Sequence, residues 1–578
     1  MSNAQRMWRL STGAIAALFA ATHTAAVFTE NINWDEFAAL DRVATMLRTH
    51  QLQGGGRPGA VELVLAPFVS GCRDVIATIQ HARLLWVAAT LSGLVALYQL
   101  MCRMRAQREQ PTRGAVLAVA LLALALPFLR WSVQVRTDQL SVVCGLWAGV
   151  ALLGSRKRAV LALLAGFGLG AGVLFTQKLV YVAGLCALLA LADVWVEGAS
   201  AWRRERGALG LRALLCTLGI SLVVGAFWWL LPHMIALPRA IPINYPSHVS
   251  AHYQRAFGGN MYGALLAALV PHCALVVALA AATLRAVLRR QGLRRLVVSW
   301  VLLCAGLAVA VVHVNLFPYF WMTLGLFPAA ALGYAVEEIS EVIPVRVRSL
   351  AALGLAAALL LPAGIYSVML LDDTQRVQRD VLHFAQRHFD AHHSGFQLEG
   401  ALACRADPDP FPVYFREHIE RLFSGPEAAA NSAALIERFR TKPVYFLIAS
   451  HMIPFFSEPV QQFWQQNYQP RWGPLYVVGR HIVGSADGSI ERWDVFAAGR
   501  YRFEALDPHD GSALRVDGQT LVHGQALQLS RGEHRLELRA PGEGSLVLAV
   551  DDAALPPQET FYSIGPIVEI IGHGYFPK

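Results

Sequence analysis

Hydrophobic segments long enough to cross a bilayer recur along the first two thirds of this chain. A membrane-spanning helix needs roughly 20 mostly apolar residues, because the hydrocarbon core is about 30 Å thick and a helix rises about 1.5 Å per residue. Eleven such segments are predicted, at residues 8–28, 82–101, 114–130, 139–154, 159–176, 179–196, 210–231, 262–284, 296–314, 319–336 and 349–371. The chain is 55% hydrophobic and only 15% charged, against about 25% charged in soluble domains. The sequence therefore predicts a polytopic α-helical membrane protein.

Lys and Arg cluster in the connections on one side of the predicted spans. The clusters lie at 103–113, 156–158, 203–206, 285–295 and 346–348, all on the side of the N-terminus. Cytoplasmic loops carry such an excess, so we expect a cytoplasmic N-terminus and a retained first span. The net charge of +9 is then a topology signal and not a sign of nucleic-acid binding. The Ala-, Leu- and Arg-rich usage suggests a high-GC bacterium, so we expect the protein in a bacterial inner (plasma) membrane.

The rest of the chain divides into an outer loop and a large tail on the extracytoplasmic (periplasmic) side. Residues 1–371 form the predicted transmembrane domain, with a first outer loop at 29–81. In that loop Phe37, Leu40, Val43 and Leu47 recur at helical spacing, which predicts an amphipathic helix along the membrane, and residues 60–71 a second short membrane-surface segment. Residues 372–492 read as a mixed α/β region, and the short alternating runs of 493–578 as a β-sandwich.

Two of the eight cysteines, Cys72 and Cys404, fall clearly on the extracytoplasmic side. Disulfides form in such compartments. We therefore expect a bridge between them that would pin the tail to the first outer loop.

Ionisable residues at the membrane boundary are costly to place there, which makes them functional candidates. Asp35 and Glu36 are adjacent, directly after the first span. They could cap a helix, because Asn33 is a good N-cap and Glu36 stands three residues later, as in a capping box. Neighbouring helical residues point about 100° apart, so one acid can cap while Asp35 stays free to accept a proton.

The next outer connections supply further charges. Arg136 and Asp138 lie in the very short loop between the third and fourth spans, and Lys178 is the only charge in the hairpin between the fifth and sixth. A snorkelling Arg136 with Asp138 as a helix N-cap is the alternative for the first two residues. Membrane-edge snorkelling is also the alternative for Lys178, although Lys is a natural partner for a phosphate.

The later connections are rich in His, Tyr and Arg. His248, His252, Tyr253 and Arg255 lie in loop 232–261, and Tyr319 lies at the edge of the tenth span. A His-x3-His pair could bind a metal, but no third ligand is evident. We therefore assign no metal site and leave the use of a divalent metal open. An aromatic membrane belt is the alternative for Tyr319.

Carboxylates, cations and aromatics on one face suit an anionic, lipid-linked substrate that arrives from the bilayer. No phosphate-binding glycine motif, dinucleotide fingerprint or nucleophile elbow is present. Nucleotide-driven chemistry is therefore not supported.

Over residues 8–371 the chain resembles the GT-C superfamily of polyprenyl-phosphate-sugar-dependent glycosyltransferases. It is most similar to the branch of protein O-mannosyltransferases and lipid A aminoarabinose transferases. The resemblance lies in the acidic pair of "NWDEFAALD" (33–41), in "VRTDQ" (135–139), in an odd number of spans and in an extracytoplasmic C-terminal domain. The family segment "KPP" is replaced here by "GRPG" (56–59), and eleven spans match the mannosyltransferases better.

The resemblance implies a GT-C-like fold and an inverting transfer from a polyprenyl-phosphate-linked sugar to an extracytoplasmic acceptor hydroxyl. It implies that Asp35 is the catalytic base with Glu36 beside it, and that Asp138 is the second-loop acid. Residues implied to bind the carrier phosphate or substrate are Lys178, Arg57, Arg136, Arg255, Tyr319, His252 and Tyr253. The acceptor could be a glycolipid, a polysaccharide or a protein.

Two other classes of protein explain part of the sequence. A multi-pass transporter would account for the spans and charges, but it predicts repeats and interrupted helices that the sequence does not reveal. A polysaccharide-binding assembly factor could use Trp464, Trp472 and Trp493 as stacking platforms, although core positions suit these residues better. A lipid-linked oligosaccharide moved en bloc is a variant of the transferase.

Overall fold

The computed structural model describes the chain from residue 3 to residue 550 with several gaps. The segments outside the described part are 51–59, 105–110, 157, 198, 235–260, 290–292, 313–319, 345, 347, 390–392, 398–399, 401, 404–415, 450–452, 473, 485–489, 510, 539–541 and the ends.

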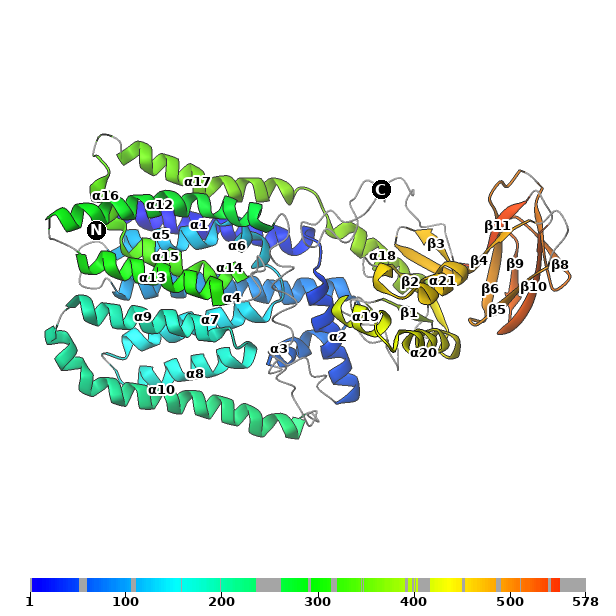
Figure 1. Ribbon diagram of the computed structural model, residues 1–578, viewed down its shortest axis with the longest axis horizontal. Helices are drawn as coiled ribbons and strands as arrows, with labels where there is room; N and C mark the ends of the chain where they lie inside the picture. The colour runs from blue at the N-terminus through cyan, green and yellow to red at the C-terminus, as the bar shows by residue number, and fades with distance from the viewer. Residues whose placement is uncertain are drawn as a thin grey trace.

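A helical bundle makes up the N-terminal two thirds of the described chain. Figure 1 shows its long helices side by side, with the N-terminus at the end far from the strand-rich domain. The helices are α1 (Asn3–Thr29), α2 (Trp34–Thr49), α3 (Ala60–Val69), α4 (Val75–Met104), α5 (Pro111–Ala123), α6 (Leu126–Trp131), α7 (Thr137–Gly154), α8 (Val160–Phe175), α9 (Leu179–Glu197), α10 (Ala199–Met234), α12 (Met261–Arg289), α13 (Leu293–Val312), α14 (Trp321–Leu324), α15 (Leu326–Tyr334), α16 (Val336–Val342) and α17 (Arg348–Met369).

Seven of the described helices are long and apolar enough to cross a membrane. They are α4, α7, α9, α10, α12, α13 and α17. The predicted spans 8–28 and 159–176 correspond to shorter apolar helical stretches, Gly13–Thr29 and Val160–Phe175. The multi-pass helical class is therefore confirmed, whereas the count of eleven spans is not.

Two predicted spans are interrupted. Residues 114–130 divide into α5 and α6, and the described part of 319–336 divides into α14 and α15. Pro127 and Pro328 each follow a break at a distance at which the proline ring would clash with the carbonyl four residues earlier. The expectation that no span is interrupted was wrong.

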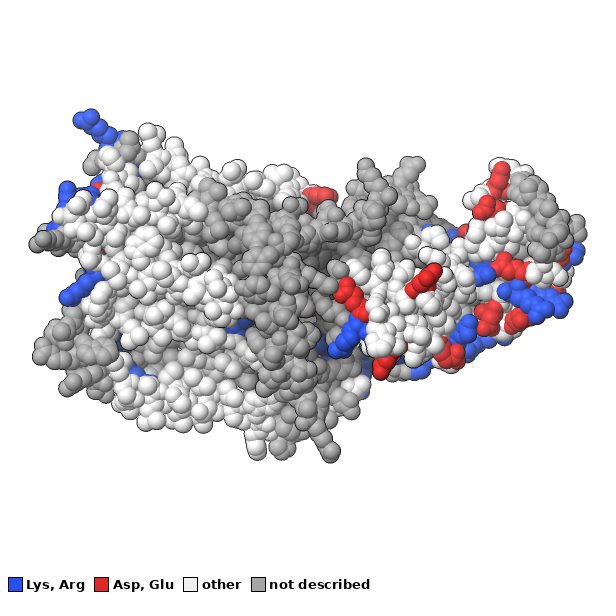
Figure 2. Space-filling view, viewed as in Figure 1, with Lys and Arg blue, Asp and Glu red and all other residues white. Residues whose placement is uncertain are grey.

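Charge separates along the bundle. Figure 2 shows a helical body whose described surface is almost free of charged side chains, with Lys and Arg at the end that carries the N-terminus. Long apolar side chains such as Leu214 and Val277 are exposed on it. An exposed apolar body of this kind fits a hydrocarbon surrounding.

The first loop lies between the bundle and the C-terminal part, as α2 and α3 show in Figure 1. Phe37, Leu40 and Val43 of α2 are buried, as the helical spacing predicted. The sequence predicted that this face would lie on the membrane. It is instead covered by protein, in a hydrophobic core shared with Leu382 of α18 and with Phe446 of β2.

The C-terminal part begins with α18 and continues as helices and strands. The elements are α18 (Gln375–His388), β1 (Ser394–Phe396), α19 (Arg416–Phe423), α20 (Ala428–Thr441), β2 (Val444–Ile448), η3 (Ile453–Phe455), α21 (Glu458–Asn467), β3 (Tyr468–Trp472), β4 (Leu475–Val483), β5 (Glu491–Val495), β6 (Gly499–Ala505), β7 (Ala513–Val516), β8 (Gln519–Val522), β9 (Ala526–Leu529), β10 (Gly532–Leu538) and β11 (Glu543–Leu548).

Two sheets organise these strands. The larger has the order β1-β2-β4-β11-β6-β9 with β3 also on β4, and the smaller has the order β5-β10-β7-β8. The long strand β4 pairs antiparallel with β2 and with β11, so one sheet runs through both predicted C-terminal regions. Trp464, Trp472 and Trp493 are buried, so they belong to the core and are not exposed stacking platforms.

Cys72 is disulfide-bonded. The six cysteines within or beside the bundle that the structure describes are free. Cys404, the predicted partner, lies outside the described residues. A Cys72–Cys404 bridge stays a prediction.

Candidate active site

The acidic pair lies at the first turn of α2, directly after the end of α1. Asn33 is the N-cap, and its side chain accepts a hydrogen bond from the Asp35 N–H at 2.9 Å. The Glu36 carboxylate accepts from the Asn33 N–H at 3.0 Å, which completes the capping box. The prediction that Glu36 caps the helix with Asn33 is confirmed.

Glu36 also forms a buried ion pair. Arg83 of α4 donates to it through Nε at 2.9 Å and Nη2 at 2.6 Å, and neither side chain has exposed surface. The Val135 N–H donates to the same carboxylate at 2.8 Å. With four donors around it, Glu36 joins the start of α2, α4 and the connection before α7.

Asp35 points to a different partner. Its Oδ2 accepts from Arg136 Nη1 at 2.9 Å, and its side chain keeps a quarter of its surface exposed. Arg136 is 8% exposed, donates through Nε to Gln134 at 3.0 Å and lies over the Trp131 ring. Asp35 is therefore paired, and not free as the sequence suggested.

Asp138, two residues after Arg136, forms a second ion pair. Lys178 Nζ lies 2.7 Å from Asp138 Oδ2, and Lys178 also lies 5.6 Å from the centre of the Phe320 ring. Asp138 is in the first turn of α7 and nearly buried, whereas the Lys178 side chain is 23% exposed. The hairpin between α8 and α9 thereby reaches the start of α7.

The segment 136–138 is the common element of the two pairs. Arg136 contributes the cation of one pair and Asp138 the anion of the other. Its backbone is also fixed, because Trp86 Nε1 donates to the Arg136 carbonyl at 2.8 Å. Two carboxylates and two cations from three predicted outer loops thus gather at one place, which is an arrangement able to bind an anion and to accept a proton.

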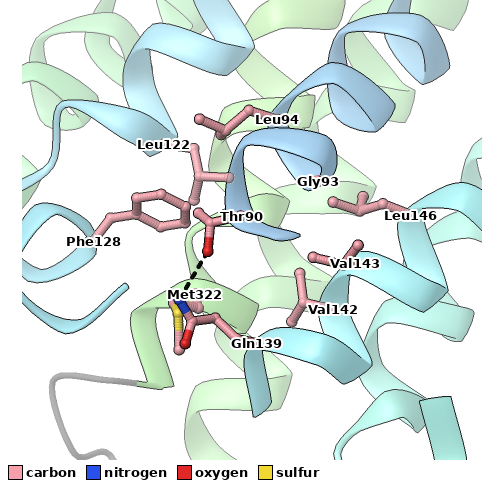
Figure 3. Close-up of a pocket in the computed structure, with 10 residues that line it drawn as sticks. All are labelled: Thr90, Gly93, Leu94, Leu122, Phe128, Gln139, Val142, Val143, Leu146 and Met322. Atoms are coloured by element: carbon pink, nitrogen blue, oxygen red, sulfur yellow. Dashed lines mark hydrogen bonds between the residues drawn. The ribbon is translucent and has the colours of Figure 1, made fainter. Parts of the chain in front are cut away.

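A small apolar pocket lies beside the first turns of α7 (Figure 3). Its cavity volume is about 20 Å³, which is room for about one water molecule, and it is lined by residues of α4, α5, α6, α7 and α14. Gln139, the residue after Asp138, lines it and donates to Thr90 at 2.8 Å and to the Ser132 carbonyl. Gln139 Oε1 is buried and has no hydrogen-bond partner among the described residues.

The remaining candidates from the sequence cannot be placed. Arg57, His252, Tyr253, Arg255 and Tyr319 lie outside the described residues, as does His248. The structure describes Asp35, Glu36, Arg136, Asp138 and Lys178, and it brings these together. Within its described part, no group of three or more His, Cys, Asp or Glu side chains could hold a metal ion.

Sequence reasoning missed the inner layer of the site. Arg83 is the partner of Glu36, and Glu30 lies close by, in contact with Tyr366 of α17 and 3.6 Å from Arg130. Arg83 could have been found, because an arginine just inside a predicted span is a functional candidate by default. Glu30, two residues after the first predicted span, carried the same signal, whereas Tyr366 inside the last span did not.

No protein-family model matches the chain, and no curated protein matches it. Among solved structures it is similar to ArnT from Cupriavidus metallidurans bound to undecaprenyl phosphate, at 13% identity and a TM-score of 0.46, over 75% of this chain and 88% of that one. It is also similar to the apo oligosaccharyltransferase of Archaeoglobus fulgidus, at 11% identity and a TM-score of 0.44, over 96% and 99%.

A further similar structure is the Archaeoglobus fulgidus oligosaccharyltransferase AglB with an inhibitory peptide and a dolichol-phosphate, at 11% identity and a TM-score of 0.40, over 95% and 94%. ArnT and AglB are both members of the GT-C superfamily. At a TM-score of 0.46 or lower, this similarity establishes neither a shared activity nor a shared ligand.

Proposed function

We propose that this chain is an integral-membrane glycosyltransferase that moves a sugar from a polyprenyl-phosphate carrier to an acceptor hydroxyl on the extracytoplasmic side. The observation that carries the proposal is the pairing of Asp35 with Arg136 and of Asp138 with Lys178 around one short segment. A transferase of this kind needs a base, cations for the leaving phosphate and access from the bilayer. The cluster offers the first two at the end of an apolar bundle.

In the proposed reaction Asp35 is the base. The acceptor oxygen attacks the anomeric carbon from the face opposite the phosphate, and the carbon–oxygen bond to the phosphate breaks with inversion. The acceptor proton passes to an oxygen of Asp35, and the bond electrons leave with the polyprenyl phosphate, whose negative charge increases. In this proposal Arg136 and Lys178 bind that charge as it develops. The donor is already activated, so the step needs no nucleotide.

The ion pairs would also determine when Asp35 can accept a proton. In the structure each cation already has a carboxylate partner. A phosphate that binds Arg136 competes with Asp35 for the same guanidinium, and Asp35 is then released as an acceptor of protons. The base would become available when the donor is in place.

The three acids take different roles in this proposal. Glu36 is saturated by four donors and has no exposed surface, so its role is to orient the start of α2. Asp138 holds Lys178 at the start of α7 and keeps its cation directed to the site.

Polyprenyl phosphate binding tests the proposal. Wild-type protein in detergent should show a rise in its thermal midpoint with polyprenyl phosphate, since a ligand at 100 times its Kd stabilises by about 2.7 kcal/mol. Lys178→Met should abolish the rise. Because that change strands the nearly buried Asp138, the double variant Lys178→Met/Asp138→Asn serves as the folded control and should also show none. No rise in wild-type protein at any concentration would argue against the transferase.

A multi-pass transporter remains the second candidate, and one observation favours it. The helix breaks between α5 and α6 and between α14 and α15 lie beside the apolar pocket, to which Leu122, Phe128 and Met322 contribute. Interrupted helices are common at transporter binding sites. Proteoliposomes separate the two functions. Transfer of labelled sugar to an acceptor without flux of free solute supports the transferase, and solute flux without transfer supports the transporter.

A further inference from the structure

The first helix of the C-terminal part makes hydrogen bonds to the backbone that leads into α2. Thr374, the N-cap of α18, accepts from the Asn31 N–H at 3.0 Å and donates to the Thr29 carbonyl at 3.1 Å. Gln378 accepts from the Ile32 N–H at 2.6 Å and donates to the Ile32 carbonyl at 2.8 Å. One amide side chain thus satisfies both backbone groups of a single residue.

The other side of the same backbone is held by the bundle. Arg83 donates to the Glu30 carbonyl at 2.8 Å and to the Asn31 carbonyl at 3.0 Å, while its remaining donors hold Glu36. Gln375 of α18 also donates to the Glu30 carbonyl, at 3.2 Å. The segment 29–33 is therefore fixed between α4 and α18, immediately before the turn that carries Asp35.

We infer that Gln378 is a positioning residue for the active site, through which the C-terminal part sets the direction of the first turn of α2. The inference rests on the proposed function for the role of Asp35. Ile32 is fully buried and Gln378 is 2% exposed, so water cannot replace the two bonds without opening the contact. A small rotation of this turn would move Asp35 relative to Arg136 and to the acceptor.

The two hydrogen bonds to the backbone of Ile32 require the donor and acceptor of a glutamine side chain. Its amide group offers one acceptor and a donor in one plane, which Leu lacks entirely. An ionised Glu can accept from the Ile32 N–H but places a negative charge against the Ile32 carbonyl. A protonated Glu carries both a donor and an acceptor, so it can restore both bonds.

A merely structural role for α18 is the rival explanation, in which the helix docks the C-terminal part and no more. Gln386 provides the matched control. It lies on the same helix, is half-buried, and donates to the Arg73 carbonyl at 3.3 Å, away from segment 29–33. Its loss weakens docking without touching the backbone before Asp35.

The experiment compares Gln378→Leu, Gln378→Glu and Gln386→Leu in the full-length protein in nanodiscs. We expect Gln378→Leu to lower kcat by about ten- to a hundredfold, as a misplaced catalytic group does, while the KM for the lipid-linked donor changes less than about twofold. Gln378→Glu should approach wild type at pH values where the introduced carboxyl is protonated, and should approach Gln378→Leu where it is ionised. Gln386→Leu should leave kcat unchanged.

Hydrogen exchange separates this inference from the proposed function. Amides of Asn31 and Ile32 should exchange faster in Gln378→Leu than in wild type and in Gln386→Leu. Unchanged exchange, an equal loss of kcat in both leucine variants, or a Gln378→Glu protein as impaired as Gln378→Leu at every pH would overturn the positioning role. If wild-type protein transfers no sugar, the proposed function fails, and exchange alone decides whether Gln378 holds the segment.

Discussion

Arg136 Nη1 donates to Asp35 Oδ2 at 2.9 Å, although the two residues are 101 positions apart in the chain. The guanidinium is fixed on its other sides by Gln134 and the Trp131 ring. This pairing places the proposed base and a proposed phosphate ligand in direct contact.

Replacement of Arg136 should reduce turnover, more when both its charge and its planar guanidinium are lost than when only the planar group is lost. Arg136→Gln removes the charge and should lower kcat/KM for the donor by about a hundredfold or more, as removal of one transition-state donor does. Arg136→Lys keeps the charge but not the planar fork, and should lie between Gln and wild type. Steady-state kinetics with purified donor measures both. Equal activity of all three proteins would exclude Arg136 from phosphate binding.

The buried Arg83–Glu36 pair should dominate the stability of the junction between α2 and α4. Arg83→Met leaves a buried carboxylate without its main partner, and breaking a buried pair in this way costs about 3–5 kcal/mol. Glu36→Gln/Arg83→Met removes both charges and should recover part of that loss. Thermal unfolding in detergent gives the midpoints. A midpoint of Arg83→Met equal to that of wild type would show that the pair contributes little.

Asp41 of α2 gives a pH-dependent prediction. Burial raises the pKa of Asp41 from 3.8 to about 6, against the attraction of Arg48 and Arg42. The folded protein therefore binds more protons than the unfolded chain between about pH 4 and 6, and this group makes stability fall as the pH rises through that window.

Asp41→Asn removes that dependence. At neutral pH it should stabilise the protein by up to about 3 kcal/mol, since one pKa unit corresponds to about 1.4 kcal/mol. At pH values below about 4 the gain should vanish. The difference in thermal midpoint between variant and wild type, measured across this pH range, tests the prediction, and a difference independent of pH would contradict it.

The sequence carried the charged residues of the site but not their partners. Asp35, Arg136, Asp138 and Lys178 stood out because charge at the edge of an apolar span is rare. That Asp35 would pair with Arg136, and not stay free, depends on packing between distant loops. The capping box of Asn33 and Glu36 was predictable, because it is encoded within four residues.

Tertiary packing also determines what covers the apolar face of α2. The spacing of Phe37, Leu40 and Val43 predicts one apolar face, and cannot distinguish lipid from protein as its cover. The structure covers that face with protein, in a core that α2 shares with α3, α4 and the C-terminal part. The breaks before Pro127 and Pro328 had a local signal, and a proline rule applied within the spans would have found them.

Transfer by Asp35→Asn protein tests the central claim most directly. Purified wild type and variant are reconstituted with labelled polyprenyl-phosphate sugar and an extract of cell-envelope acceptors, and released polyprenyl phosphate is measured alongside polyprenyl phosphate binding. The account predicts that Asp35→Asn binds the lipid phosphate and folds as wild type does, but releases none above background. Turnover of Asp35→Asn at the wild-type rate would contradict the assignment of Asp35 as the base.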